Sequence, residues 1–264
     1  MKALWLLALL APLAAAAQDK AVDAGPYVPS PQSVVSDMLK LAGVGPQDYV
    51  IDLGSGDGRI VRTAALVFGA RGLGIEIKDE LVRQANADAQ REGIAERAKF
   101  VNADLFKADL SAATVVTMYL LPDTVNLLRG KLLAELRPGT RVISHDYPLS
   151  GWVPEKYVQM DLEDKVKISG VTTTLIYLYV VPAKVEGRWR GKVGGQPLEL
   201  DLRQDITRVG GTGRVAGSAG AGAPLEGGKL RGVALSFRLA GREYRGRVEG
   251  TTIAGDGWRV ERVP

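Results

Sequence analysis

Tyr49–Ile60, YVIDLGSGDGRI, contains the pattern from which the architecture of the chain follows. Its first residues form an apolar run of the kind found in a buried parallel strand. The glycine-rich segment Gly54–Gly58 interrupts the run, and helical spacing of apolar residues begins at Ile60. A strand, a tight glycine turn and a helix in succession open a nucleotide-binding βαβ unit. The glycines permit a sharp turn and let a ligand approach the backbone with no Cβ in its way.

Asp52 narrows the class of ligand. It ends the predicted strand with a carboxylate where a dinucleotide-binding fold would have its first glycine. This charge would repel a pyrophosphate, whereas it would attract the ammonium of an amino-acid-bearing nucleoside. The spacing DxGxGxG therefore favours an S-adenosylmethionine (SAM) site, with an ordinary βα turn as the alternative. The residues predicted to form the cofactor loop are Asp52, Gly54, Ser55, Gly56, Asp57 and Gly58.

Two further acidic residues follow the next predicted strands. Glu76 lies in the apolar strand Gly72–Ile77, where the ribose hydroxyls of a nucleoside would need acceptors. Asp104 belongs to the predicted strand Lys99–Phe106, where a carboxylate could accept a hydrogen bond from the adenine amino group. The carboxyl ends of parallel strands meet at one edge of an open α/β sheet, so these acids are expected to lie close to Asp52. Three acids on three successive strand ends indicate a nucleoside site more specifically than the glycine turn alone.

The remaining elements extend this α/β pattern. A lead helix, Ser33–Leu41 with Ser33 as its N-cap, could cover the ligand site or pack on the sheet. Lys165–Ser169 and Thr172–Val181 alternate like an antiparallel pair that closes the sheet. The other predicted elements are the helices Glu80–Gly93 and Asp123–Leu136, the latter N-capped by Asp123, and the strands Ala112–Pro122 and Thr140–Ser144.

Composition limits the available chemistry. The chain has 264 residues, 46% hydrophobic and 24% charged, which is ordinary for a soluble globular protein with one full core and a small second domain. The absence of cysteine excludes disulfides, thiolate metal sites and Cys nucleophiles. The single histidine, His145, disfavours a histidine-based metal cluster, and no metal is expected.

The tail from Lys184 onward has a different composition. It holds 18 of the 32 glycines and carries 15 Lys and Arg against 9 Asp and Glu, whereas the remainder carries 19 against 21. The core domain therefore shows no nucleic-acid footprint. Alternating apolar and charged residues predict a small β meander or barrel, with Gly217–Pro224 as a flexible loop. The basic side chains could form a solvated face or dock an acidic partner or a membrane.

Met1–Ala17 has the layout of a secretory signal peptide, with a basic Lys2, an apolar stretch and a small-residue end. The apolar stretch is shorter than a spanning helix, and Pro12 interrupts it. We expect export to the periplasm, with an uncleaved membrane anchor as the alternative. The predicted organisation is a signal peptide over 1–17, an extended segment and lead helix over 18–48, a cofactor-binding domain over 49–182 and a β domain over 184–264.

These residues resemble the seven-stranded class I SAM-dependent methyltransferases. The closer resemblance is to small lysine methyltransferases that modify the mitochondrial ATP synthase c-subunit and the adenine nucleotide translocase, and to their bacterial relatives. It covers roughly residues 26–182 through DLGSGDGRI, FVNADLF, YLLP and SHDYPLSGW. The resemblance implies a Rossmann-like seven-stranded sheet and the cofactor SAM. It assigns the glycine motif to Asp52, Gly54, Gly56 and Gly58, the ribose acid to Glu76 and the adenine-side acid to Asp104.

Methyl transfer from a sulfonium to nitrogen needs alignment and a dry site more than acid–base machinery. A lysine acceptor must first lose a proton, which costs roughly 4–5 kcal/mol at pH 7 from a reference pKa of about 10.4. A structural role is the alternative for every residue suggested for these steps. The candidates for the acceptor pocket are Tyr119, Trp152 and Tyr27. The candidates to receive the proton are Asp146, Tyr147 and, as a general base, His145.

The function best supported by the sequence is SAM-dependent methylation of a nucleophilic nitrogen, with a protein lysine as the favoured acceptor. A non-catalytic SAM- or nucleoside-binding envelope protein is one alternative, because an exported enzyme would have no evident cofactor supply. A small-molecule methyltransferase is another. YLLP at the fourth strand end differs from the NPPY motif that base N-methyltransferases use, which disfavours a nucleobase acceptor. The sequence does not predict an oligomeric state.

Overall fold

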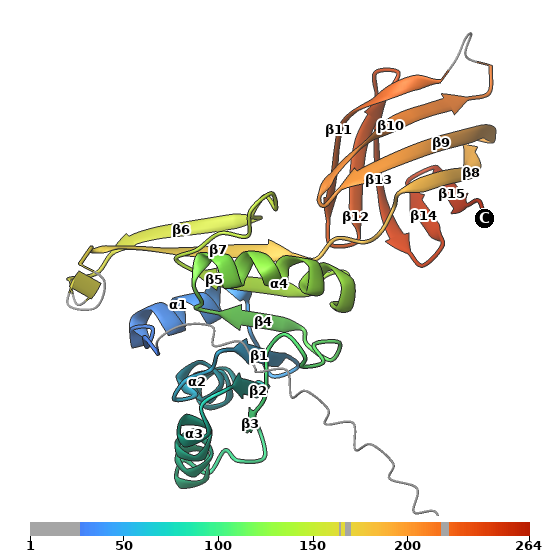
Figure 1. Ribbon diagram of the computed structural model, residues 1–264. Helices are drawn as coiled ribbons and strands as arrows, with labels where there is room; N and C mark the ends of the chain where they lie inside the picture. Colours follow the sequence, from blue (N-terminus) through green and yellow to red (C-terminus); the bar gives the residue numbers. More distant parts are fainter. Residues whose placement is uncertain (1–26, 164, 167–169, 218–221) are drawn as a thin grey trace, which may run out of the picture.

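The computed structural model describes residues 27–163, 165–166, 170–217 and 222–264. It contains a seven-stranded mixed sheet flanked by helices and, beyond it, a closed barrel of eight antiparallel strands (Figure 1). This architecture confirms the predicted Rossmann-like α/β sheet and the C-terminal antiparallel β domain. The proposed signal peptide lies outside the described residues. Within the described ranges, no helix is long and apolar enough to cross a membrane.

The sheet has the strand order β3-β2-β1-β4-β5-β7-β6. The first five strands are parallel, and β7 is antiparallel to both of its neighbours. Because β2 and β4 lie on opposite sides of β1, the strand order reverses beside β1, where open α/β sheets bind ligands. The strands are β1 (Tyr49–Leu53), β2 (Arg71–Glu76), β3 (Ala98–Asn102), β4 (Val115–Met118), β5 (Arg141–His145), β6 (Lys156–Asp161) and β7 (Thr173–Val180).

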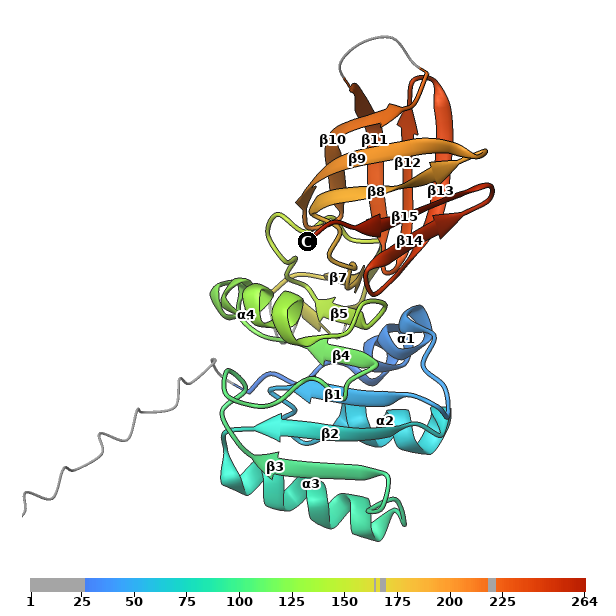
Figure 2. The same cartoon turned by 90° about the vertical axis from the view of Figure 1, so that its right-hand side faces the viewer.

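Helices cover both faces of the sheet (Figure 2). They are α1 (Gln32–Ala42), α2 (Arg59–Phe68) and α3 (Asp79–Arg91) on one face and α4 (Pro122–Glu135) on the other. Successive residues of a strand point to opposite faces, so Val50 packs with α1 and α2 whereas Ile51 packs with α4. The lead helix α1 thus packs on the sheet, which was one of its two expected positions.

Two predicted helix caps are wrong. α1 begins after Pro31, which places Ser33 inside the helix, and no side chain caps either this helix or α4. α4 begins with Pro122, so Asp123 lies in its first turn. In α4, proline at the first helical position has no N–H to satisfy and already has a helical φ, so it starts the helix without a polar cap. In α1, proline is the N-cap residue itself and has no side-chain acceptor.

The predicted partner strand of β7 is also wrong. β7 pairs with β6, Lys156–Asp161, whereas the described part of Lys165–Ser169 belongs to the connection between the two strands. β6 is the edge strand of the sheet, and its side chains are exposed or half-buried throughout. Only Val158 and Met160 are half-buried, so the apolar alternation that marks a half-buried strand in a sequence is very short.

The barrel is an up-and-down meander in which each strand pairs with the next and β15 pairs with β8. Aromatic side chains fill its interior: Trp189, Phe237, Tyr244 and Trp258 are at most 5% exposed. The barrel is therefore a second packed core. Its strands are β8 (Gly187–Val193), β9 (Gln196–Asp205), β10 (Arg208–Val215), β11 (Ala223–Arg231), β12 (Ala234–Leu239), β13 (Arg242–Glu249), β14 (Thr252–Gly255) and β15 (Trp258–Arg262).

Many basic side chains on the barrel surface have acidic partners. Arg190 and Arg214 both pair with Glu199, at 3.4 and 3.1 Å. Three more exposed pairs join residues two apart on one strand: Arg245–Glu243, Arg247–Glu249 and Arg259–Glu261. Such pairs reduce the positive charge available to an acidic partner or a membrane, so they favour a solvated face.

The barrel contacts the edge of the sheet opposite the glycine loop. Arg231 pairs with Glu155 at 3.0 Å, and Ile206 packs against the core beneath α4. A Cβ at Gly232 would lie 3.2 Å from Cγ1 of Val180, the last residue of β7. Because β7 runs antiparallel to β5, this contact is at the amino end of the parallel strands. The barrel therefore lies away from the carboxyl edge, where α/β sheets bind ligands.

A chain that ends at Pro182 is expected to fold and to bind SAM, the cofactor predicted from the sequence, with an affinity within about twofold of the full chain's. The reason is that the barrel has its own buried core and meets the sheet away from the predicted cofactor loop. Calorimetric SAM titration of the truncated and full chains measures this. An insoluble or cofactor-free truncation would show that the barrel completes the core of the sheet.

Candidate active site

A cavity of about 210 Å³ opens at the carboxyl ends of the central strands. Its walls are the glycine loop, the ends of β2 and β4, the turn after β3 and the extended segment before α1. Ten residues expected from the sequence line it: Tyr27, Asp52, Gly54, Ser55, Gly56, Asp57, Glu76, Asp104, Tyr119 and Tyr147. Four others expected at the site do not line it: Gly58, His145, Asp146 and Trp152.

The glycine loop adopts a conformation that only glycine enters readily. Gly54, Gly56 and Gly58 have φ values of +73°, +54° and +79°. A Cβ at Gly56 would lie 2.4 Å from the ring of Tyr27, so the ring packs directly on bare backbone. A Cβ at Gly58 would lie 2.5 Å from the ring of Phe100, behind the loop. Gly58 thus supports packing, while the other two glycines face the cavity.

Asp52 is a buried carboxylate with one neutral hydrogen-bond donor. Its side chain is 2% exposed, and its Oδ1 accepts a hydrogen bond of 2.7 Å from the Thr117 hydroxyl on β4. Burial raises the pKa of Asp52 to about 7, although the hydrogen bond from Thr117 lowers it. The negative charges of Glu76 and Asp57 add to the rise. A cation placed in the cavity would relieve this unfavourable burial of charge.

Glu76 organises the loop as well as lining the cavity. Its Oε2 accepts a hydrogen bond of 2.9 Å from the Gly56 N–H, and its Oε1 accepts two of 2.9 Å from the N–H groups of Ile77 and Lys78. The side chain is 7% exposed. One buried carboxylate therefore joins the glycine loop to the turn after β2. Its position in an apolar strand was visible in the sequence, but this second role was not.

Asp104 and Ser55 also line the cavity. Asp104 lies two residues beyond the end of β3, and its Oδ1 accepts a hydrogen bond of 2.8 Å from the Phe106 N–H. The Ser55 Oγ is buried and has no hydrogen-bond partner among the described residues. This oxygen lies beside Gly74 and Phe100 in the interior, so Ser55 lines the cavity without presenting its hydroxyl to it.

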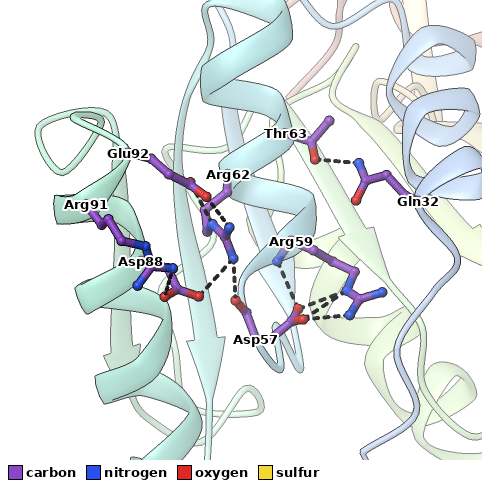
Figure 3. A network of polar contacts seen from close by, with 8 residues as sticks. All are labelled: Gln32, Asp57, Arg59, Arg62, Thr63, Asp88, Arg91 and Glu92. Atoms are coloured by element: carbon purple, nitrogen blue, oxygen red, sulfur yellow. Dashed lines mark hydrogen bonds and ion pairs between the residues drawn. The ribbon is translucent and has the colours of Figure 1, made fainter.

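The segment before α1 forms the wall of the cavity opposite the strand ends. Tyr27 packs on Gly56, and Arg59 donates a hydrogen bond of 2.8 Å to the carbonyl oxygen of Ser30. Arg59 also pairs with Asp57 through several hydrogen bonds, the shortest 2.6 Å (Figure 3). Burial opposes ionisation of Asp57, but the hydrogen bonds from Arg59 outweigh it and hold the pKa of this carboxyl below its ordinary value. Asp57 therefore anchors this wall.

A second polar network fixes the helix that follows the loop. Arg62 on α2 pairs with Glu92 and, at 3.2 Å, with Asp88, which joins α2 to α3 (Figure 3). Gln32 of α1 donates a hydrogen bond of 2.9 Å to the Thr63 hydroxyl. These contacts fix the positions of the three helices on that face of the sheet relative to the glycine loop.

Tyr119 and Tyr147 line the cavity near the end of β4. The Tyr119 ring lies 3.9 Å from the ring of His145, and the Tyr119 hydroxyl lies near the Asp146 carboxylate. Burial, followed by the charge of Asp146, raises the pKa of Tyr119 above its ordinary value. The hydroxyl is therefore neutral and can accept a hydrogen bond from a ligand in the cavity.

His145 lies behind Tyr119 and is fully buried. Its Nδ1 is 2.9 Å from the Ser30 hydroxyl, and its Nε2 is 2.7 Å from the Thr174 hydroxyl. Thr174 donates to Asp146, so Nε2 carries the proton and Nδ1 accepts from Ser30. Burial lowers the pKa of His145 to about 4. With both nitrogens engaged inside the protein, this arrangement gives no support to the expectation that His145 acts as a general base.

Trp152 also has a different position from the one expected. It is 3% exposed and packs in the core beneath α4, 5.2 Å from the ring of Tyr179. This places Trp152 among core residues and outside the lining of the cavity. Among the described residues, no group of three His, Asp or Glu side chains is arranged to hold a metal ion.

Residues from Asp52 to Lys156 match the family described as the ANTKMT methyltransferase domain. A protein-lysine N-methyltransferase of Saccharolobus islandicus is 43% identical over 157 residues, which make up 59% of this chain and 93% of the archaeal protein. The chain belongs to this methyltransferase family. The adenine nucleotide translocase lysine N-methyltransferase of Mus musculus is 37% identical over 129 residues, or 49% of this chain, but the match spans only 56% of the mouse protein.

A solved structure identifies the cofactor. The RNA methyltransferase of Salinibacter ruber, in complex with S-adenosyl-L-homocysteine, is 46% identical. The similarity covers 60% of this chain and 96% of that one, with a TM-score of 0.54. S-adenosyl-L-homocysteine is SAM without its methyl group. The glycine loop and the carboxylates that line the cavity fit such a cofactor. The chain is therefore a SAM-dependent methyltransferase.

Proposed function

We propose that this methyltransferase transfers the methyl group of SAM to the side-chain nitrogen of a protein lysine. The proposal is carried by one observation, the cavity with three carboxylates on one wall and two tyrosines on another, in a chain that is 43% identical to a protein-lysine N-methyltransferase. The carboxylates suit a cationic nucleoside, and the tyrosines suit an amine that has lost its proton.

The cofactor would be held by residues of the glycine loop and the strand ends. Asp52 would pair with its ammonium, because this carboxylate has a raised pKa and no cationic partner among the described residues. Glu76 would accept hydrogen bonds from the ribose hydroxyls, and Asp104 from the adenine amino group. Gly54 and Gly56 would supply the positive-φ turn that brings the loop backbone to the cavity wall. The cofactor supplies a methyl group on a sulfonium.

The acceptor amine would be held by Tyr119 and Tyr147. Asp146 is a poor proton acceptor, because its Oδ1 already receives three hydrogen bonds and its pKa lies below the ordinary value. Desolvation in the cavity disfavours the ammonium form of an incoming lysine, which promotes loss of its proton to solvent as it enters. The hydroxyl oxygens of the two tyrosines would then orient the neutral amine for in-line attack.

Incubation of the full chain with methyl-labelled SAM and envelope or cytosolic fractions tests this function. The expected result is label that resists ribonuclease, is removed by protease and is recovered as methyllysine after hydrolysis. The Glu80→Ala variant is a matched control, because Glu80 is exposed on α3 near the cavity and should label equally. Label removed by ribonuclease would overturn the lysine proposal in favour of an RNA acceptor, as in the name of the Salinibacter relative. Label in small molecules alone would also overturn it.

We also propose that the chain is exported, on the signal-peptide pattern of Met1–Ala17. Export depends on how the translocation machinery recognises these residues and not on what the folded domain binds. N-terminal sequencing of the fractionated protein tests the proposal, with a periplasmic chain beginning near Gln18 as the expected result. Intact Met1 on a membrane-bound, cytoplasm-facing chain would instead indicate an anchor and access to cytoplasmic SAM.

A further inference from the structure

Asp146 has a strained backbone conformation beside the cavity. Its φ is +62°, a left-handed value that is unusual for a residue other than glycine. Its Oδ1 accepts hydrogen bonds from Lys165 Nζ at 2.7 Å, from the Thr174 hydroxyl at 3.0 Å and from the Leu175 N–H at 3.0 Å. Backbone strain of this kind persists only where the surrounding contacts hold the backbone in that conformation, and it is concentrated at functional sites.

Lys165 is the charged member of this set. It lies in the connection between β6 and β7, and its side chain is only 4% exposed. Its ammonium donates to Asp146 and, at 2.6 Å, to the carbonyl oxygen of Thr173. A buried ion pair is weak evidence for stability, because desolvation of both charges offsets their attraction. We therefore look for the role of this ion pair in the position that it gives to the Asp146 carboxylate.

The ion pair acts on a residue of the cavity wall. Asp146 Oδ1 lies 3.6 Å from His145 Nε2, the His145 ring lies 3.9 Å from the Tyr119 ring, and Tyr119 lines the cavity. His145 lies against the Tyr119 ring and links Thr174 to Ser30 on the opposite wall. The position of the Tyr119 ring thus depends on Asp146 through Thr174 and His145, and Lys165 supplies the positive charge that keeps Asp146 ionised and in place.

We propose that Lys165 is a positioning residue for methyl transfer. Its ammonium holds the Asp146 carboxylate ionised and in its strained conformation, so that the carboxylate, through Thr174 and the His145 ring, fixes Tyr119 on the acceptor side of the cavity. Lys165 itself touches neither the cofactor nor the reacting atoms. The inference rests on the proposed function, in which Tyr119 orients the acceptor amine.

The charges around Asp146 agree with this role. Burial opposes its ionisation, but the charge that His145 carries when protonated at low pH, the Lys165 ammonium and the Leu175 N–H together hold its pKa below the ordinary value. The other titratable groups that face it are the hydroxyls of Tyr119 and Tyr177. His145 is neutral at neutral pH, since its pKa is about 4, which leaves Lys165 as the positive charge in direct contact.

The test compares full-length Lys165→Met with the wild-type chain on the same acceptor fraction. We expect kcat to fall about 10- to 100-fold, which is the usual cost of a misplaced catalytic group. SAM affinity should change less than about twofold, because Lys165 contacts no residue assigned to the cofactor. Without the ammonium, the pKa of Asp146 rises and the carboxyl takes up a proton as pH falls. The ratio of wild-type to variant kcat should therefore increase toward low pH. Titration of the acceptor amine affects both chains equally and cancels in this ratio.

Two further variants distinguish a positioning role of Lys165 from a role in stabilising the fold alone. Lys165→Gln keeps a donor but loses the charge, so it should show the same pH-dependent ratio and decides the question should Lys165→Met not fold. Arg141→Met is the matched control, because Arg141 and Asp48 form a half-buried ion pair at the opposite edge of the sheet. It should lower the melting temperature and leave the ratio constant with pH.

Two results would count against the inference in different ways. If the wild type methylates its acceptor and the Lys165 variants match it in kcat and pH profile, Lys165 only fastens the β6–β7 connection to β5 and the inference is overturned. If the wild type transfers no methyl group to any fraction, the proposed function fails and the inference fails with it.

Discussion

Asp52→Asn is expected to stabilise the ligand-free protein while weakening SAM binding. Asp52 is almost fully buried, its hydrogen-bond donor Thr117 is neutral, and its pKa is raised to about 7. Asparagine has the same shape, and its carbonyl oxygen can still accept the hydrogen bond from Thr117. The variant therefore removes a buried charge without opening a cavity. It also removes the charge proposed to pair with the cofactor ammonium.

The sign of the pH dependence follows from linkage. In the unfolded chain Asp52 has its ordinary pKa of about 3.9, and folding raises it. The favourable contribution of Asp52 to the free energy of unfolding is therefore complete below the unfolded pKa. It is lost as pH rises through the folded pKa of about 7. Three pKa units correspond to at most about 4 kcal/mol. An unpaired amide N–H in the variant costs about 1–3 kcal/mol of this gain. The net effect should thus be a stabilisation of about 1–3 kcal/mol at pH 8. Near pH 4, where the gain from removing the charge is lost and the amide N–H cost remains, it should be a destabilisation of about 1–3 kcal/mol.

Thermal unfolding of both chains at pH 4, 6 and 8, together with SAM titration calorimetry at pH 8, measures the two effects. SAM affinity should fall at least tenfold, since a hydrogen-bonded charge pair is lost. Wild-type affinity should itself decline below about pH 7, where Asp52 becomes protonated in the free protein. An Asp52→Asn chain that is less stable than wild type at pH 8 and binds SAM normally would contradict both the burial argument and the proposed ammonium contact.

The centre of the fold was predictable because local and tertiary requirements agree there. The loop after β1 needs backbone with positive φ at Gly54, Gly56 and Gly58, and only glycine meets this requirement without strain. The apolar run of β1 is buried on both faces, so its pattern is unambiguous. A strand, glycine turn and helix with an acid at the strand end leave few architectures to choose from.

The outer part of the sheet was not predictable in the same way. β6 forms only because β7 offers it a partner, and its own side chains bury little surface. The starts of α1 and α4 depend on Pro31 and Pro122 and not on polar caps. A sequence pattern shows which residues are buried, so an edge strand with only two half-buried residues, Val158 and Met160, leaves a weak periodic signal.

The residues expected at the site also fall into two groups, those that line the cavity and those that pack elsewhere. Asp52, Glu76 and Asp104 were found because the end of a parallel strand has a known place in the fold. Trp152 and His145 follow β5 in the sequence just as closely, but one packs in the core and the other behind Tyr119. Sequence position after a strand does not say whether a side chain turns toward the cavity or away from it. That information comes only from packing.

Glu76→Ala is expected to cause the largest loss of SAM affinity of any single substitution in the cavity. On the sequence alone, loss of one ribose contact would cost about 1–3 kcal/mol. The structure adds a second cost, because Glu76 also accepts hydrogen bonds from the N–H groups of Gly56, Ile77 and Lys78. Without the carboxylate these donors lose their acceptor, and Gly56 is no longer tied to the end of β2. We therefore expect at least a 100-fold weaker SAM complex and a lower melting temperature.

Glu76→Gln distinguishes loop organisation from ribose contact alone. Glutamine can still accept from Ile77 and Lys78 with its one carbonyl oxygen, but its NH₂ group would face the Gly56 N–H, donor against donor. The glutamine variant should thus lose nearly as much affinity as the alanine variant, although it retains size and polarity. Calorimetry on both variants, with Glu80→Ala as the exposed control on the same segment, measures the difference. A Glu76→Gln chain that binds SAM as tightly as wild type would show that Glu76 neither holds the loop through Gly56 nor needs its charge for the cofactor.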